Sequence, residues 1–408
     1  MKLTTKIAAI AVLTLPCVIH AAPPSISDVL VKQDEARLVT ISYTLTGADA
    51  IVTMDVLTNG VSIGSALYAN ATGDYKTIVR QGARKIFWQP RATWPDQKIR
   101  DNSLSVKLTV WALDNPPDYM CVDLVTPSNV VWYVCTNDVP GGVTADIYKT
   151  DKLLMRRIHA EGIRWLMGLP KSNGTANKWE PGHFVTLTND YYMAIFEMTR
   201  GQRERIVSGT TASNADYPDR STSYEGLRGA TSGHDWPTDG HKVADDSVIG
   251  KLRKHAGITG FDLPTQAEFE YAARAGDLGY CYFYWGFNTG TAAVQPYEWL
   301  SVTVPSSAAQ KVGLLNPNPW GLYDMLGNCF ERCLDWYADG DGYSKHGSEV
   351  IAPPGPTTGS TRVIHGGGYT HAHTAAYVFN REGYAPGSVN NTNIGYRLAC
   401  LADFNDAL

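Results

Sequence analysis

The sequence predicts an α+β protein in which a small all-β sandwich precedes a larger and more irregular domain. Two observations carry this prediction. Between residues 23 and 115, several short segments alternate apolar and polar residues, as half-buried strands do. Between residues 116 and 408, a few capped helical patterns interrupt long stretches rich in Gly, Pro, Asn and aromatic residues. The chain has 408 residues, of which 44% are hydrophobic and 18% charged, and this composition suits two globular domains.

Three alternating segments predict the first domain. Residues 39–45 place an apolar side chain at every second position, and residues 52–56 continue this period. Asn59-Gly60 then gives a strong signal for a type I′ hairpin turn. The alternation returns at residues 104–110. Strands with no helical pattern between them indicate an antiparallel sandwich, with the proline-containing residues 114–118 as its linker to the second domain.

The first 22 residues are predicted to be a signal peptide. Lys2 and Lys6 supply its positive start, an apolar stretch follows to residue 19, and Ala21-Ala22 suits cleavage. We therefore expect an exported protein, periplasmic or secreted, with no membrane span. The formal net charge is −5 and no Lys/Arg cluster stands out, so nucleic acid is not an expected partner. Six of the seven cysteines remain after cleavage, and their pairing stays open.

Capping boxes and helical periodicity predict three helices in the second domain. Residues 199–202 contain a capping box that starts the first of them. Residues 247–256 carry their apolar side chains on one helical face. The clearest helix has Thr265 as its N-cap, Glu268 closing the capping box, and Gly276 as its end.

Three short motifs have simpler interpretations than the sites they resemble. Residues 60–64 match the GxSxG pattern of a nucleophile elbow, but they follow a hairpin turn, so a turn running into a strand is expected. Residues 339–342 resemble part of a calcium loop that lacks the Glu expected at its twelfth position, and we expect a plain turn. His371 and His373 would share one face of a strand, as in some metal sites, yet no third ligand follows from the spacing. Two exposed or hydrogen-bonded histidines are therefore the preferred interpretation.

Four regions of the second domain together resemble the formylglycine-generating enzyme family, also called the sulfatase-modifying-factor family. Their order and spacing agree with the family, and they frame roughly residues 150 to 402. The matching segments are YYMAIFEMT at 191–199, LPTQAEFEYAARAG at 263–276, NPWGLYDMLGN at 318–328, and the closing pair HGG at 365–367 and IGYRLA at 394–399. The resemblance implies a fold related to C-type lectins, irregular and poor in regular structure, with a C-terminal segment on the functional surface.

The resemblance also implies a chemistry, which this sequence departs from. Enzymatic members of the family use copper held by two cysteines to oxidise a substrate cysteine of sulfatases to formylglycine. In this sequence the two cysteine positions fall on His371 and Ala376, and the preceding serine position is Gly368. The family's Trp-Glu-Trp appears as Phe330-Glu331-Arg332. Because soft thiolates are what select Cu(I), we expect neither copper nor the oxidase reaction.

A calcium site of the family is expected to survive in part. By resemblance, its ligands would be the Asp324 side chain, the Gly327 and Cys329 carbonyls, and Glu331. Oxygen donors on a tight loop suit a hard cation. The alternative is that Asp324 and Glu331 cap or pair locally, and the sequence leaves both interpretations open.

The sequence favours a non-catalytic module that binds a protein or glycan ligand through its C-terminal loop surface. Residues 369–393 are rich in Tyr, His, Thr and Asn, which supply rigid aromatic contact and adaptable hydrogen bonds. The candidate ligand-binding residues are Tyr369, His371, His373, Tyr377, Asn380, Arg381, Asn390, Asn391 and Asn393. The alternative is a formylglycine-generating or other metal-dependent oxidase acting on protein cysteine. A third hypothesis makes the chain a scaffold whose sandwich docks a partner or cell surface.

Overall fold

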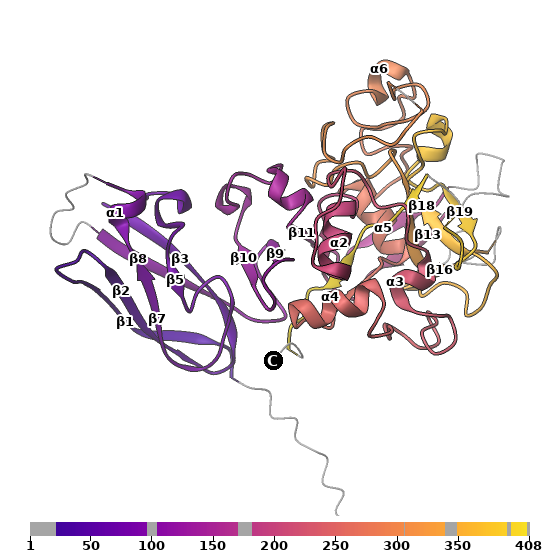
Figure 1. Ribbon diagram of the computed structural model, residues 1–408. Coiled ribbons are helices and arrows are strands. Elements are labelled where there is room, and N and C mark those ends of the chain that lie inside the picture. Colours follow the sequence, from indigo (N-terminus) through magenta and orange to yellow (C-terminus); the bar gives the residue numbers. More distant parts are fainter. Residues whose placement is uncertain are drawn as a thin grey trace, which may run out of the picture.

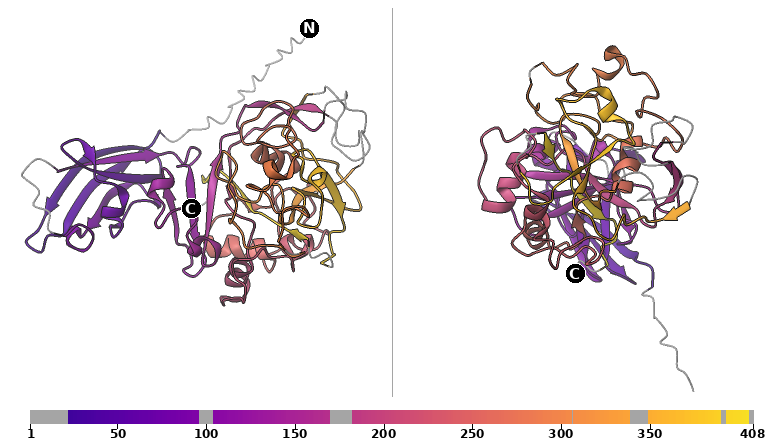
Figure 2. Two further views of the ribbon diagram at one scale, coloured as in Figure 1. Left: turned by 90° about the horizontal axis from the view of Figure 1, so that it is seen from above. Right: turned by 90° about the vertical axis from the view of Figure 1, so that its right-hand side faces the viewer.

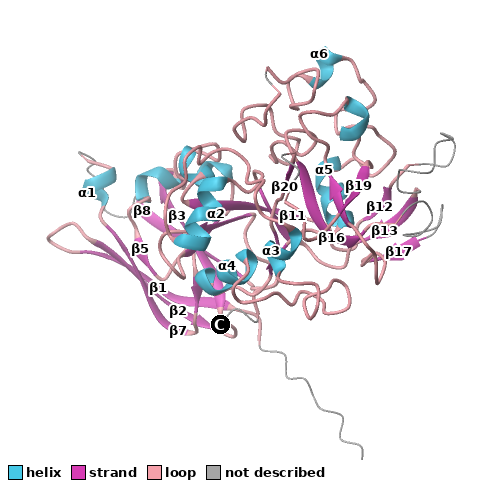
Figure 3. Ribbon diagram, turned by 45° about the vertical axis from the view of Figure 1, so that its right-hand side comes forward, coloured by secondary structure: helices cyan, strands magenta, loops and turns pink. Residues whose placement is uncertain are grey.

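The computed structural model describes residues 22–95, 104–169, 182–305, 307–338, 349–389 and 393–405. It is a sheet-rich structure with few helices, in which a β-strand block is followed by a larger part dominated by loops (Figures 1 and 3). Within the described residues, no helix is both long and apolar enough to cross a membrane.

Two antiparallel sheets form the N-terminal part. One has the strand order β1-β2-β7-β5, and in the other β3 pairs with β4, β6 and β8. The strands are β1 (Ser25–Gln33), β2 (Val39–Thr46), β3 (Ala50–Thr58), β4 (Val61–Ser62), β5 (Thr72–Gly73), β6 (Ile78–Val79), β7 (Gly82–Trp88) and β8 (Leu104–Trp111). Short helical turns lie at η1 (Ser65–Tyr68) and α1 (Pro90–Thr93).

The alternation in the sequence is confirmed by the burial of β2. Ile41, Tyr43 and Leu45 point into a hydrophobic core, and the residues between them are partly exposed. The predicted hairpin turn is confirmed as well, because Asn59 and Gly60 have φ of 50° and 80°, the two positive values that a type I′ turn requires. The GxSxG stretch is a turn running into β4, as expected, although the short η1 turn comes after it.

The larger part is built on a six-stranded sheet of order β10-β9-β11-β14-β21-β15. Its strands are β9 (Tyr119–Asp123), β10 (Val130–Tyr133), β11 (Lys152–Ile158), β14 (Tyr191–Ala194), β15 (Phe261–Asp262) and β21 (Ala399–Leu401). Two smaller sheets have the orders β12-β13-β17 and β19-β18-β16-β20. Their strands are β12 (Arg164–Met167), β13 (His183–Thr186), β16 (Phe330–Trp336), β17 (Glu349–Ile351), β18 (Arg362–His365), β19 (Arg381–Tyr384) and β20 (Ile394–Gly395).

The three predicted helices are confirmed. Thr199 and Thr265 each cap a helix with a complete capping box, and Ser247 caps the third with its hydroxyl. The end of the helix that Thr265 caps differs by one residue from the prediction, because Ala275, with φ of 49°, takes the left-handed position before Gly276. The helices are α2 (Arg200–Ser208), α3 (Tyr224–Arg228), α4 (Val248–Ala256), α5 (Gln266–Arg274) and α6 (Thr291–Val294), with 3-10 turns η2 (Thr136–Asp138), η3 (Asp146–Lys149) and η6 (His373–Ala376).

The two parts meet along the edge of the six-stranded sheet. Figure 2 shows the sandwich on one side of the β9–β10 hairpin and the loops and helices of the larger part on the other. Ile51 of β3 belongs to the same hydrophobic cluster as Trp132 of β10 and Met155 of β11. The linker is held as well, because Arg157 donates to Asn115 Oδ1 at 2.8 Å and forms an ion pair with Asp190.

Candidate functional site

An aromatic run in the loop before α6 forms the most distinctive surface of the larger part. Residues 280–287 read Tyr-Cys-Tyr-Phe-Tyr-Trp-Gly-Phe, so six of eight side chains are aromatic. This loop lies beside the C-terminal segment, because Val378 N donates to Tyr282 O at 2.8 Å. In Figure 1, α6 and the loops around it stand at the top of the larger part, away from the sandwich.

Ring stacking joins the two segments into one aromatic cluster. Tyr282 stacks on Tyr377 with centroids 4.5 Å apart and planes 14° apart. Phe283, Trp285 and Tyr297 form a second stack, with successive centroids 4.3 and 4.9 Å apart. We define the aromatic cluster as Tyr280, Tyr282, Phe283, Tyr284, Trp285, Phe287, Tyr297, Tyr377 and Phe379. Phe283, Tyr377 and Phe379 are buried, whereas Phe287 is 53% exposed, so the cluster has a buried base and an open edge.

Of the two candidate histidines, His373 lies at the margin of this cluster, while His371 contacts residues outside it. They are not on a strand, because His371 is in a turn and His373 begins η6. His371 Nδ1 forms a 3.1 Å hydrogen bond with Thr370 Oγ1, and its ring contacts that of Phe330 in an edge-to-face arrangement. His373 packs its ring 6.1 Å from that of Tyr377. Both side chains are partly exposed, so they can contact a ligand, but they do not share one strand face.

The other candidate ligand-binding residues divide between the interior and the surface. Asn393 is partly exposed and donates to Thr370 Oγ1, which places it beside His371. Asn390 and Asn391 lie outside the described residues. The remaining four were expected on the surface, but they are buried and would not contact a ligand directly. They are Tyr369, Tyr377, Asn380 and Arg381.

The cysteines do not gather near the family's two cysteine positions. Those positions, His371 and Ala376, occupy the same short segment, and Ala376 is fully buried. The six cysteines from residue 121 onward are all free thiols, and five of them are buried. Cys329 packs against Tyr369, and burial raises its thiol pKa well above the usual value.

Four buried carboxylates and Arg397 interact in the interior, and we call this group the acidic centre: Glu197, Glu298, Asp324 and Glu331, with Arg397 among them. It adjoins the aromatic cluster, because Tyr284 donates to Glu298 Oε1 at 3.2 Å. Three of these carboxylates accept backbone N–H groups of irregular loops. Glu197 accepts from Cys329 N at 3.0 Å, Glu298 from Leu326 N at 3.1 Å, and Asp324 from Gly313 N at 2.7 Å. The carboxylates therefore hold in place loops that no helix or sheet supports.

Arg397 is the cation at the middle of the acidic centre. It donates to both oxygens of Glu331, with Nη2 at 2.8 Å from Oε1 and Nε at 3.0 Å from Oε2. Its other hydrogen bonds reach the carbonyls of Ala194, Ile195 and Tyr323. Burial would lower the pKa of Arg397, but Glu331 and its neighbours raise it, so the guanidinium stays charged.

One cation does not balance four carboxylates, and the carboxyl pKa values respond. Burial, followed by repulsion from Asp324, raises the pKa of both Glu197 and Glu298 well above the usual range. Burial raises the pKa of Asp324 to about 6. The interior thus favours protonated carboxyl groups, which keep their role as hydrogen-bond partners without a full negative charge.

The structure shows how the side chains of two of the implied calcium ligands are bonded. Glu331 is paired through both oxygens with Arg397. Asp324 uses one oxygen for Gly313, and its Oδ1 is buried without a hydrogen-bond partner. In the described part of the chain, no three or more His, Cys, Asp or Glu residues are grouped so that they could hold a metal ion.

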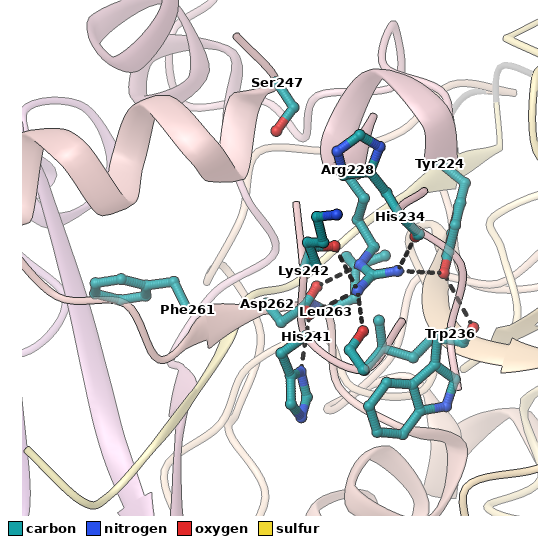
Figure 4. A network of polar contacts seen from close by, with 12 residues as sticks. Tyr224, Arg228, His234, Trp236, His241, Lys242, Ser247, Phe261, Asp262 and Leu263 are labelled. Carbon is teal, nitrogen blue, oxygen red and sulfur yellow. Dashed lines mark hydrogen bonds and ion pairs between the residues drawn. The ribbon is translucent and has the colours of Figure 1, made fainter. Parts of the chain in front are cut away.

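A second polar network is centred on the buried Arg228 (Figure 4). Arg228 donates to both oxygens of Asp262 and to the carbonyls of His234 and Gly240. His241, whose side chain is 58% exposed, contacts the same carboxylate at 2.9 Å. These bonds fasten the loop after α3 to β15, and they account for all the polar groups of Arg228, which indicates a structural role.

The larger part combines a sheet-rich fold with long loops, a buried acidic centre and a C-terminal loop surface. These features agree with a scaffold of the formylglycine-generating type. Residues 157–402 match the family described as the sulfatase-modifying factor enzyme 1-like domain, and this match covers more than half of the chain. The chain belongs to this family.

Similar proteins include formylglycine-generating enzymes and a protein kinase. The formylglycine-generating enzyme of Streptomyces coelicolor is 33% identical over 160 residues, which cover 36% of this chain and 49% of the enzyme. The mouse formylglycine-generating enzyme is 28% identical over 266 residues, covering 55% of this chain and 68% of the enzyme. The serine/threonine-protein kinase pkn1 of Chlamydia pneumoniae is 35% identical over 151 residues, covering 37% of this chain. The chain spans only 22% of that kinase's length.

Solved structures give more distant likenesses. Treponema denticola variable protein 1 is 23% identical with a TM-score of 0.46, covering 61% of this chain and 95% of that protein. PvdO from Pseudomonas aeruginosa is 20% identical with a TM-score of 0.48, covering 61% of this chain and 94% of that protein. At these values neither likeness places a functional residue.

Proposed function

We propose that this chain is a non-catalytic binding protein that contacts a protein or glycan ligand through the open edge of its aromatic cluster and the adjoining C-terminal loop. The observation that carries the proposal is the stack of Tyr282 on Tyr377, because it joins the aromatic loop and the C-terminal loop into one rigid surface. At its margin, Phe287 is exposed and His373, which packs near Tyr377, is partly exposed. Rigid aromatic rings beside adaptable polar side chains are the composition that binding surfaces favour.

The residues at the family's cysteine positions support binding rather than oxidation. A thiolate pair is what would hold Cu(I), and here the two positions are His371 and Ala376. The proposal includes a C-type-lectin-like arrangement of the larger part, and the N-terminal signal segment suggests that the protein works outside the cytoplasm. In this setting the loops would meet a ligand on a cell surface or in the periplasm.

Binding is tested with exposed residues whose removal leaves the core intact. The Phe287→Ala and His373→Ala variants are compared with the wild type on panels of immobilised glycans and purified extracellular proteins. A ligand held by this surface should lose about tenfold or more in affinity with Phe287→Ala, since aromatic anchors dominate interfaces. Leu314→Ala is the matched control, because Leu314 is similarly exposed (56%) but is not part of the aromatic cluster. Equal loss in the control would remove the support for this surface.

The oxidase alternative is tested by chemistry. The purified chain is loaded with Cu(I) and incubated with a sulfatase-type cysteine peptide, and formylglycine is measured by mass spectrometry. We expect no conversion by the wild type. The His371→Cys/Ala376→Cys double variant restores thiols at the family's positions and is the matched test of the scaffold. Conversion by the wild type would overturn the non-catalytic assignment.

A further inference from the structure

A cavity of about 840 Å³ lies between the sandwich and the larger part, and none of the aromatic cluster's residues line it. One wall comes from residues 65–77 of the sandwich and the other from residues 128–142, around β10 and η2. The two walls are bonded to each other, since Trp132 N donates to Lys76 O at 2.9 Å and Ser65 Oγ donates to Asn137 O at 3.2 Å. A cavity of this size at a domain junction is a common place for a small ligand.

Lys76 supplies the positive charge of this cavity. Its ammonium lies 5.1 to 5.7 Å from the ring centres of three tyrosines, Tyr68 and Tyr75 on the sandwich and Tyr133 on β10. In the described part of the chain, no carboxylate oxygen lies within 4.0 Å of this ammonium, so it forms no ion pair there. Burial lowers the pKa of Lys76, and the more distant Asp138 opposes that shift. A partly desolvated ammonium without an ion-pair partner is a ready site for a ligand anion.

The other lining residues indicate which further groups a ligand of this cavity would carry. The lining includes hydroxyl and amide side chains, among them Thr72, Thr77, Asn129 and Thr136, and they can donate to or accept from ligand hydroxyls. Asp138, the acidic residue in the lining, can only accept hydrogen bonds when ionised, so it suits a ligand rich in hydroxyl groups. The rings of Tyr75 and Tyr133 add flat apolar area.

We propose that this cavity binds an acidic carbohydrate, with the ligand carboxylate on the Lys76 ammonium, the sugar hydroxyls on Asp138 and the hydroxyl and amide side chains, and the sugar ring against Tyr75 and Tyr133. This site is independent of the aromatic cluster. It gives the sandwich a part in ligand binding, because both halves of the chain contribute walls.

Calorimetric titration of the full chain with trigalacturonate, and with the neutral galactose trisaccharide, tests the proposal. We expect trigalacturonate to bind about tenfold or more tightly than the neutral sugar, the difference that one charge-assisted contact gives. The Lys76→Met variant should lose this preference, and Lys76→Arg should retain most of it. Phe287→Ala should bind trigalacturonate as the wild type does, which separates this site from the surface proposed above.

A readout on the wild type covers the case in which Lys76→Met does not fold. Lysine acetylation followed by mass spectrometry reports the accessibility of Lys76, and we expect trigalacturonate, but not the neutral sugar, to protect it. No binding of trigalacturonate at millimolar concentration, equal binding of the neutral sugar, or unchanged binding by a folded Lys76→Met variant would each overturn the proposal.

Discussion

Asp324 lies in the interior with one carboxylate oxygen bonded to Gly313 and the other without a partner. Burial raises its pKa from 3.8 to about 6. The folded protein therefore binds more protons than the unfolded chain between those two values. Because stability falls with pH wherever the folded state holds the extra proton, this residue costs stability as the pH rises through about 4 to 6.

The Asp324→Asn variant separates this interpretation from a calcium site. Asparagine keeps an oxygen for Gly313 and removes the charge, so the free energy of unfolding at pH 7 should rise by on the order of 1 to 3 kcal/mol. Urea unfolding from pH 4 to 8 should also show a flatter pH dependence. The same curves are recorded with EDTA and with millimolar calcium. A wild type that calcium stabilises, together with a variant that it does not, would restore Asp324 as a metal ligand.

Arg397 holds the acidic centre together, and its removal is predicted to be severe. Arg397→Met would leave Glu331 buried without its partner and would free three backbone carbonyls. The expected loss is about 3 to 5 kcal/mol in urea unfolding at pH 7. Adding Glu331→Gln to Arg397→Met removes the unpaired charge and should recover part of the loss. A double variant as unstable as the single one would show that the carbonyl bonds, not the charge, matter most.

At the scale of single elements, helices with local signals could be predicted and surfaces made by distant segments could not. The capping box of α5 is contained in four consecutive residues, so the sequence alone indicates its start. The aromatic run at 280–287 can be seen in the sequence, but it was not among the predicted site residues. Its stacking partner Tyr377 lies far along the chain, so no local pattern connects the two segments. Tyr369 and Tyr377 were expected on the surface for the same reason, because no local period reveals that stacking and loop packing bury them.

The start of α5 is the element whose contribution can be measured most directly. Thr265 accepts from Glu268 N at 3.1 Å, and Glu268 accepts in return from Thr265 N at 2.8 Å. Thr265→Ala removes the first bond and should lower the free energy of unfolding by about 1 kcal/mol. Thr265→Ser keeps the hydroxyl and should lose little. Equal losses in urea unfolding for both variants would assign the effect to the methyl group's packing instead of the cap.

At the scale of the whole molecule, β3 explains why the two halves are joined. Residues 50–54 are buried on both faces, unlike the alternating β2. Val52 and Met54 face the sandwich core, while Ile51 joins the hydrophobic cluster of the larger part. The unbroken apolar run at 50–52 was the signal in the sequence, and the division of the chain near residue 115 did not use it. An interface between halves depends on contacts that no local pattern encodes.

This shared cluster predicts that the chain unfolds as one unit. Because Ile51 is fully buried against the larger part, calorimetry of the wild type should show a single transition. Ile51→Asn places an amide in that apolar contact, which costs roughly 1 to 3 kcal/mol where it finds no partner. The halves should then melt separately, giving two transitions. Val61→Asn, on the same sandwich but with 70% of its side chain exposed, should keep the single transition. Two transitions already in the wild type would mean that the cluster packs the halves together without coupling their unfolding, and the cavity at their junction would then lose one wall in the first transition.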